Sequence, residues 1–175
     1  MNKRIAVFGH RKIDEEDKKC NYIENRTSIV FKSLIDDGDK TFLFGSKSEF
    51  DDLCYITITN FQEKYTDIER RGYLCANEIA FTEEEYVNYL ALSKTKKPKL
   101  KKYRIYEEIK QFEFDGKNMY IERNKKIIDD ADICIFYYKK ENLQPKNKLG
   151  IKTNSGTKIA LDYAELKNKE IIIIN

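Results

Sequence analysis

A short turn, Gly9-His10-Arg11, follows an apolar run near the N-terminus and carries groups that could bind phosphate. Glycine allows a ligand to approach the backbone closely, and the forked guanidinium of Arg11 suits a phosphate group. His10 could donate a hydrogen bond to the same group. A strand-ending turn with solvated side chains would have the same sequence, so both interpretations stay open. The turn is not a G-x-G-x-x-G motif, so the dinucleotide fingerprint is absent.

Two further turns combine glycine with small polar residues and lead into predicted helices. Backbone N–H groups at a helix N-terminus bind anions, and small hydroxyls add to such a site. The same residue types also cap helices without any ligand, so here too both interpretations stay open. Neither turn is a Walker A loop. The candidate ligand-binding residues are Gly45, Ser46, Lys47, Ser48 and Asp51 in the first turn, and Asn154, Ser155, Gly156 and Thr157 in the second. Asp51 and Asn154 are expected to orient ligand hydroxyls.

A fourth candidate group, Glu122-Arg123-Asn124, lies in a helical pattern that precedes a long apolar run. Arg123 and Asn124 could reach toward a ligand held by the glycine-containing turns. For one arginine seen alone, an ion pair with a helix neighbour four residues away is the commoner explanation.

The elements that would position these groups are short apolar segments. Each is rich in β-branched or aromatic residues and is apolar at successive positions, which is typical of strands buried on both faces of a parallel sheet. Four such segments are Arg4–Phe8, Thr41–Phe44, Asp132–Tyr138 and Glu170–Ile174, and a fifth strand is expected at Arg71–Asn77.

Helical patterns separate the strands, at Tyr22–Asp37, Phe50–Lys64, Met119–Asp129 and Gly156–Leu166. Strand–helix alternation of this kind predicts an α/β protein with a Rossmann-like, doubly wound, mainly parallel sheet and helices on both faces. We expect one domain over residues 1–175, with residues 82–117 as a polar insertion that starts as a helix and continues as a Lys-rich loop. Ligands of such sheets bind beyond the carboxyl ends of the strands.

The composition of the chain limits the classes of partner and ligand that we expect. Lys and Arg number 33 against 30 Asp and Glu, giving a net charge of +3, and this near balance argues against nucleic acid as a partner. Four cysteines without metal-ligand spacing and a single histidine predict no metal site and no cofactor. The apolar runs are too short to span a membrane, so a cytoplasmic protein with reduced thiols is expected. Assembly into a homo-oligomer is compatible with the sequence.

Taken in order, the segments FGHR, FLFGSKSEFD, ERN, DDADICIFYY and NSGTKIALDYAELKNKEIIIIN resemble the SLOG superfamily of Rossmann-like proteins. This superfamily includes DprA and the Lonely Guy (LOG) enzymes, and the likeness is strongest to its small bacterial members that begin with a strand and GHR. The resemblance covers about residues 3–70 and 118–175 and fails across the insertion. It implies a Rossmann-like fold that binds nucleotides or nucleotide-derived ligands.

The resemblance supports a binding pocket more firmly than catalysis. LOG enzymes cleave the N-glycosidic bond of nucleoside monophosphates, and their signature pairs a helix arginine with a PGGxGTxxE loop whose glutamate is catalytic. Arg123 matches the arginine and Gly156-Thr157 match the GT, but Thr153-Asn154 replace two glycines and Ala160 stands at the glutamate position. If the protein is an enzyme, the candidate catalytic residues are Arg123 and Glu49.

The leading prediction is therefore a module that binds a phosphorylated nucleotide or nucleotide-derived small molecule, as a sensor or a sequestering protein. The alternatives are a LOG-like N-glycosidase (phosphoribohydrolase) and, third, a DprA-like binder of single-stranded DNA. In the leading interpretation, alanine at Arg11 or Arg123 weakens ligand binding about tenfold and leaves stability nearly unchanged.

Overall fold

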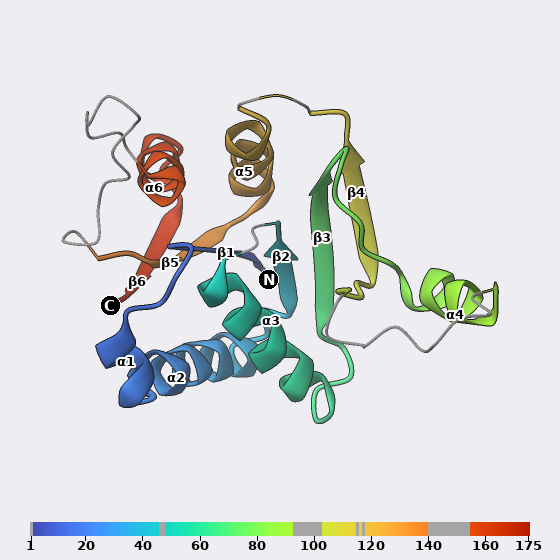
Figure 1. The fold of residues 1–175 in the computed structure, drawn as a ribbon. Coiled ribbons are helices and arrows are strands. Elements are labelled where there is room, and N and C mark those ends of the chain that lie inside the picture. Colours follow the sequence, from blue (N-terminus) through green and yellow to red (C-terminus); the bar gives the residue numbers. More distant parts are fainter. Residues whose placement is uncertain (1, 46–47, 93–102, 115, 117, 140–154) are drawn as a thin grey trace.

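The computed structural model describes residues 2–45, 48–92, 103–114, 116, 118–139 and 155–175. In this part of the chain, parallel strands form a single sheet of order β4-β3-β2-β1-β5-β6 (Figure 1). The strands are β1 (Arg4–Gly9), β2 (Thr41–Phe44), β3 (Glu69–Cys75), β4 (Glu108–Phe112), β5 (Ile133–Tyr137) and β6 (Glu170–Ile174). The predicted Rossmann-like, doubly wound fold is confirmed.

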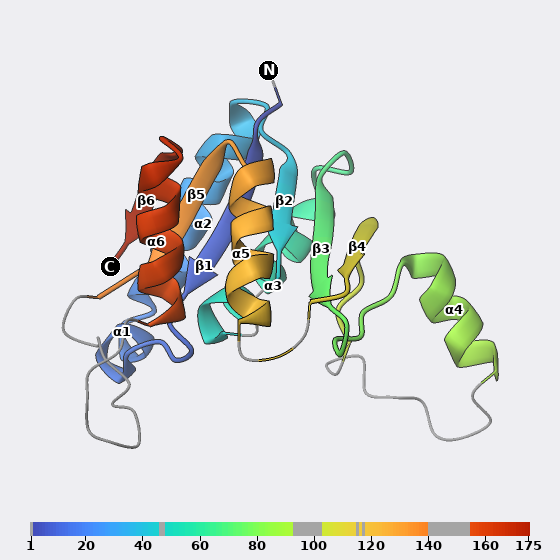
Figure 2. The same cartoon turned by 90° about the horizontal axis from the view of Figure 1, so that it is seen from above.

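Helices cover both faces of the sheet, as Figure 2 shows from above. One face carries α2 (Tyr22–Asp36) and α3 (Glu49–Gln62), preceded by the short α1 (Glu15–Lys19). The other face carries α5 (Met119–Asp130) and α6 (Gly156–Leu166). The remaining described helix, α4 (Glu83–Leu92), projects away from the sheet beyond β4. No described helix has the length and apolar character needed to cross a membrane.

The continuous apolar runs reflect burial on both faces. In β1, Ile5 and Val7 pack in the core beneath α2 and α3, whereas Ala6 and Phe8 pack beneath α5 and α6. All four are at most 2% exposed. A central strand that alternates its side chains between two buried faces must be apolar at every position, and this is the pattern that the sequence shows.

The predicted insertion at residues 82–117 contains part of the sheet. Its helical start is α4, but β4 follows within the same stretch and pairs in parallel with β3 as an edge strand. The sequence EIKQF did not predict this strand, because β4 is only partly buried and has apolar residues at only two of its positions, Ile109 and Phe112. The sheet therefore extends one strand further than expected.

Candidate functional site

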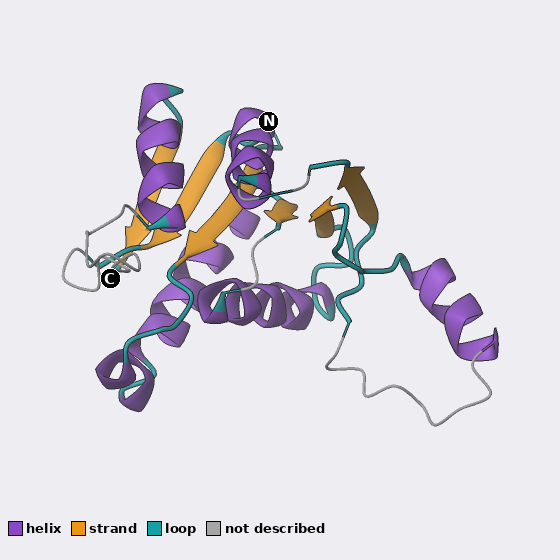
Figure 3. Cartoon of the chain, turned by 45° about the horizontal axis from the view of Figure 1, so that its top comes forward, coloured by secondary structure: helices purple, strands orange, loops and turns teal. Residues whose placement is uncertain are grey.

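The chain reverses the direction in which it adds strands at β1. It moves from β1 to β2 on one side and returns to place β5 on the other side. Ligands of doubly wound sheets bind at this switch point, outside the carboxyl ends of the strands. A cleft of about 1150 Å³ lies there, between the loop after β1 and the N-terminal turns of α5 and α6. These two helices lie side by side (Figure 3).

Most of the predicted site residues meet in this cleft. The predicted residues that line it are Gly9, His10, Arg11, Ser48, Arg123, Asn124, Ser155, Gly156 and Thr157. Gly45, Glu49 and Asp51 do not line it. Ser46, Lys47 and Asn154 lie outside the described residues. The cleft also contains charged and aromatic side chains that the sequence did not point to, which are Lys12, Asp14, Glu15, Glu78 and Tyr120.

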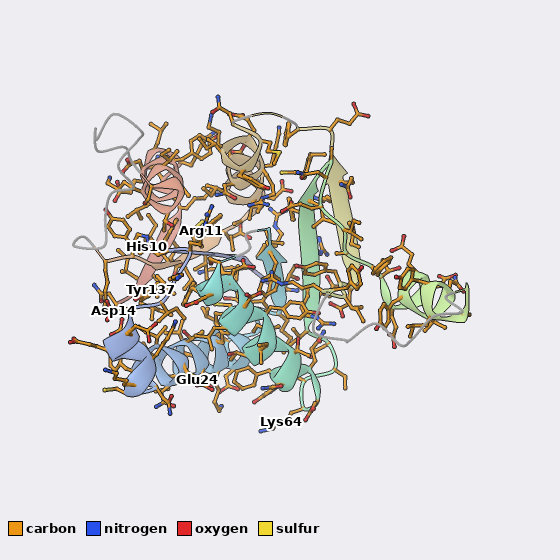
Figure 4. All side chains as sticks on the ribbon, viewed as in Figure 1. His10, Arg11, Asp14, Glu24, Lys64 and Tyr137 are labelled. Atoms are coloured by element: carbon orange, nitrogen blue, oxygen red, sulfur yellow. The ribbon has the colours of Figure 1, made fainter. Side chains whose placement is uncertain are left out.

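Arg11 and Lys12 supply the positive charge of the cleft. Both are exposed, and neither makes an ion pair with another described residue. Figure 4 shows Arg11 beside His10 in the loop after β1. Since neither is held in an ion pair with a described residue, Arg11 and Lys12 can bind an anion without first breaking such a pair.

His10 is a neutral hydrogen-bond donor at the base of this loop. Its Nε2 accepts a hydrogen bond from the Lys139 backbone N–H at 3.2 Å, and its ring stacks on Tyr138 with centroids 5.4 Å apart. Burial lowers the pKa of His10. Because Nε2 is an acceptor in this hydrogen bond, the ring proton of the neutral imidazole lies on Nδ1.

The loop after β1 is held in place by side chains from two other elements. The Glu49 carboxylate accepts a hydrogen bond from the Ile13 N–H at 2.9 Å and pairs with Lys18 at 2.8 Å, and its backbone N–H donates to the Arg11 carbonyl. Tyr137 accepts from the Asp14 N–H at 3.0 Å (Figure 4). The Lys18 ammonium, together with the Ile13 N–H, lowers the pKa of Glu49. Glu49, predicted as a catalytic candidate, therefore positions the Arg11 loop from outside the cleft.

Arg123 forms a buried ion pair with Glu78. The Arg123 Nη1 lies 3.0 and 3.1 Å from the two carboxylate oxygens, and the side chains are 3% and 2% exposed. Glu78 also accepts from the Cys75 N–H at 2.8 Å. Asn124 Oδ1 accepts from Arg123 Nη2 at 3.1 Å, so the Asn124 amide N–H₂ is left to donate elsewhere. The charge of Arg123 is thus balanced within the protein, unlike the charge of Arg11.

Gly45 and Gly9, which were predicted to contact a ligand, allow close packing within the protein. A Cβ at Gly45 would lie 2.5 Å from Ile127 Cδ1 and 3.0 Å from Arg123 Nε, so Gly45 lets the buried guanidinium approach β2. Gly9 lines the cleft, but a Cβ there would lie 2.5 Å from Phe50 Cβ, so this glycine also lets β1 approach α3. Gly156 differs from both, because a Cβ at this position would meet nothing within 4 Å.

The first turn of α6 presents backbone N–H groups to the cleft. Ser155 is the N-cap, and its Oγ accepts from the Lys158 N–H at 3.1 Å. Gly156 and Thr157 follow, and N–H groups this close to a helix start have no intrahelical acceptor. They can donate to an anion that Arg11 or Lys12 also contacts.

Asp51 belongs to a buried ion pair behind the cleft. Its side chain is 0% exposed and pairs with Arg104, which also pairs with Asp52. The Asp51 backbone N–H donates to Ser48 Oγ at 3.0 Å, which caps α3. Burial raises the pKa of Asp51 to about 6, although the Arg104 guanidinium opposes the shift. The prediction that Asp51 orients ligand hydroxyls is therefore wrong, since the residue joins α3 to the segment before β4.

This raised pKa predicts a specific pH dependence of stability. Because folding favours the protonated carboxyl, Asp51 contributes stability that is complete below its unfolded pKa of 3.8 and is lost as the pH rises through about 6. The free energy of unfolding should fall by about 2 kcal/mol more in the wild type than in Asp51→Asn between about pH 4.5 and 7.5. Urea denaturation at both pH values measures this difference. Glu24→Gln is the control and should keep the wild-type pH dependence, since Glu24 is exposed on α2 and pairs with no described residue.

Comparison with known proteins supports the fold. No protein-family model matches the chain, and no curated protein is similar to it. Among solved structures, it is similar to DNA processing protein A from Helicobacter pylori, which was described for a unique mode of binding single-stranded DNA. The TM-score is 0.55 at 14% sequence identity, and the match covers 99% of this chain and 66% of the other. At this identity the likeness establishes a shared Rossmann-like fold.

The same comparison corrects the expectation that nucleic acid is not a partner. That expectation depended on the net charge of +3, but a protein of this fold binds single-stranded DNA, so the exclusion was wrong. The physical reason is that net charge averages over the whole surface. Phosphate is bound by local cations, and Arg11 and Lys12 place two of them in one cleft.

Proposed function

We propose that this chain, which has the fold of DNA processing protein A, binds a phosphorylated nucleotide in the cleft beside β1. Arg11, Lys12 and the first turn of α6 contact the phosphate, while His10 and Asn124 donate to phosphate or ribose oxygens. The observation that carries this proposal is that two exposed cations, neither in an ion pair with a described residue, and a helix N-terminus line the same cleft. In this function the protein acts as a sensor or as a sequestering module.

The carboxylates in the cleft favour binding over cleavage, because each of them already makes a contact within the protein. Glu78 is held by Arg123 and the Cys75 N–H, Asp14 caps α1, and Glu15 pairs with Lys18. Ala160, at the position of the LOG glutamate, is 3% exposed and packs in the core. An N-glycosidase needs a carboxylate that can act on the leaving base or the attacking water, and each of these groups would have to give up a contact first.

Binding of single-stranded DNA is a second candidate function, and the likeness to DNA processing protein A favours it. The cations that would contact the phosphate of a mononucleotide would contact a DNA phosphate equally well. If single-stranded DNA followed the cleft, the protein would contact several of its phosphates. The affinity for DNA would then fall steeply as the salt concentration rises.

Calorimetric titration of the purified protein with AMP, adenosine and a short oligothymidylate tests these functions. We expect AMP to bind at least about tenfold more tightly than adenosine, because the phosphate makes charge-assisted hydrogen bonds. Free adenine is measured in the same samples, and its release would support the N-glycosidase. Tighter binding of the oligothymidylate than of AMP would support the DNA-binding function. Equal affinity for AMP and adenosine, or no binding at all, would contradict the proposal.

A further inference from the structure

Tyr120 is an exposed aromatic side chain on the wall of the cleft. It lies in the first turn of α5, lines the same cleft as Arg11 and Gly156, and is 46% exposed. A single exposed aromatic residue outside such a cleft needs no explanation, and Tyr22 on α2, which is 48% exposed and does not line the cleft, is such a residue. An exposed ring inside a cleft that carries phosphate-binding groups offers its apolar face to a bound ligand.

A fixed guanidinium supports the ring of Tyr120. The Arg123 Cζ lies 5.1 Å from the ring centroid, within the range of a cation–π contact. Arg123 is itself buried and held by Glu78 and Asn124, so the ring rests on a group that cannot easily move. Since Arg123 is only 2% exposed, the accessible surface of Tyr120 lies on the side away from it.

On the basis of the nucleotide-binding function proposed above, we propose that Tyr120 stacks on the nucleobase of the ligand. Purine and pyrimidine rings both present a flat π-face, so this contact recognises a nucleobase as a class without reading its edges. The cleft of about 1150 Å³ is large enough to hold a phosphate at Arg11 and a base at Tyr120 together. The Arg123–Glu78 pair then has a role in the site as the support of the stacking ring.

The experiment separates the base from the phosphate by comparing AMP with ribose 5-phosphate, which lacks a base. Calorimetric affinities are measured for the wild type, Tyr120→Leu, Tyr120→Phe and the exposure-matched control Tyr22→Leu. Tyr120→Leu should weaken AMP binding roughly 5- to 150-fold, the range found when a stacking aromatic residue is removed. Tyr120→Phe keeps the aromatic face and should stay within about threefold of the wild type, and no variant should change the affinity for ribose 5-phosphate.

Several outcomes would overturn the stacking role. Unchanged AMP affinity in Tyr120→Leu would exclude stacking, and so would an equal loss of affinity for AMP and ribose 5-phosphate. A loss of AMP affinity in Tyr22→Leu as large as in Tyr120→Leu would also contradict it. If the wild type bound ribose 5-phosphate but gained nothing from the base, stacking would be wrong while phosphate binding stood. If the wild type bound neither compound, the proposed function itself would be wrong.

Discussion

Replacing Arg123 with methionine should lower the free energy of unfolding by about 3–5 kcal/mol, the cost of breaking a buried ion pair by removing one partner. Glu78 would remain 2% exposed, with the Cys75 N–H as a hydrogen-bond donor but without the guanidinium. This result differs from the sequence-based expectation that alanine at Arg123 would affect binding alone. That expectation assumed a solvent-facing arginine, and the structure shows a buried one.

Urea denaturation of the single variant and of the double variant Arg123→Met/Glu78→Leu tests this account of the pair. Removing both members of the pair takes away the buried charge that the single variant retains, so the double variant should recover most of the stability that the single variant loses. A single variant within about 1 kcal/mol of the wild type would show that Glu78 does not depend on Arg123, because surface-type substitutions have effects of that size.

The second large effect is expected on binding. Arg11→Ala should weaken the affinity for AMP about 10- to 150-fold, the equivalent of a charge-assisted hydrogen bond of about 1.5–3 kcal/mol. Its stability should stay within about 0.5 kcal/mol of the wild type, because Arg11 is exposed and pairs with no described residue. Calorimetric titration with AMP and thermal melting measure the two quantities.

Arg26→Ala is the matched control for this prediction. Arg26 is likewise exposed and pairs with no described residue, but it lies on α2 and does not line the cleft. Equal losses of AMP affinity in Arg11→Ala and Arg26→Ala would mean that overall charge, and not the cleft, attracts the ligand. A large loss of stability in Arg11→Ala would show that the residue has a structural role.

The central strands were predictable because burial on two faces leaves a local signature. The segments that became β1 and β5 are apolar at every interior position, and no distant residue is needed to recognise them. The edge strand β4 carries no such signature. It pairs with one neighbouring strand and is only partly buried, so its sequence EIKQF need not be apolar throughout. Long-range pairing with β3 makes this segment a strand, and a local pattern does not reveal that pairing.

The site residues that follow strand ends were predictable from the sequence. The side-chain pairs that form between distant segments of the chain were not. Arg11 and Gly156 follow from the rule that strand ends and helix starts meet at the switch point. The pairing of Arg123 with Glu78, 45 residues away, depends on how β3 and α5 pack. Glu78 could have been suspected, because it comes soon after a predicted strand, but its chain position alone gave no partner. Asp51 was misassigned for the same reason, since Arg104 lies 53 residues further along.

Chemical-shift mapping of the backbone amides during titration with AMP tests most directly whether one cleft binds the nucleotide. The largest shifts are predicted in the loop after β1, at residues 9–12, and in the first turns of α5 and α6, at residues 120–124 and 155–157. These segments are far apart in sequence and all line the cleft. Shifts confined to α2 or α4, or no saturable shifts at all, would contradict the account.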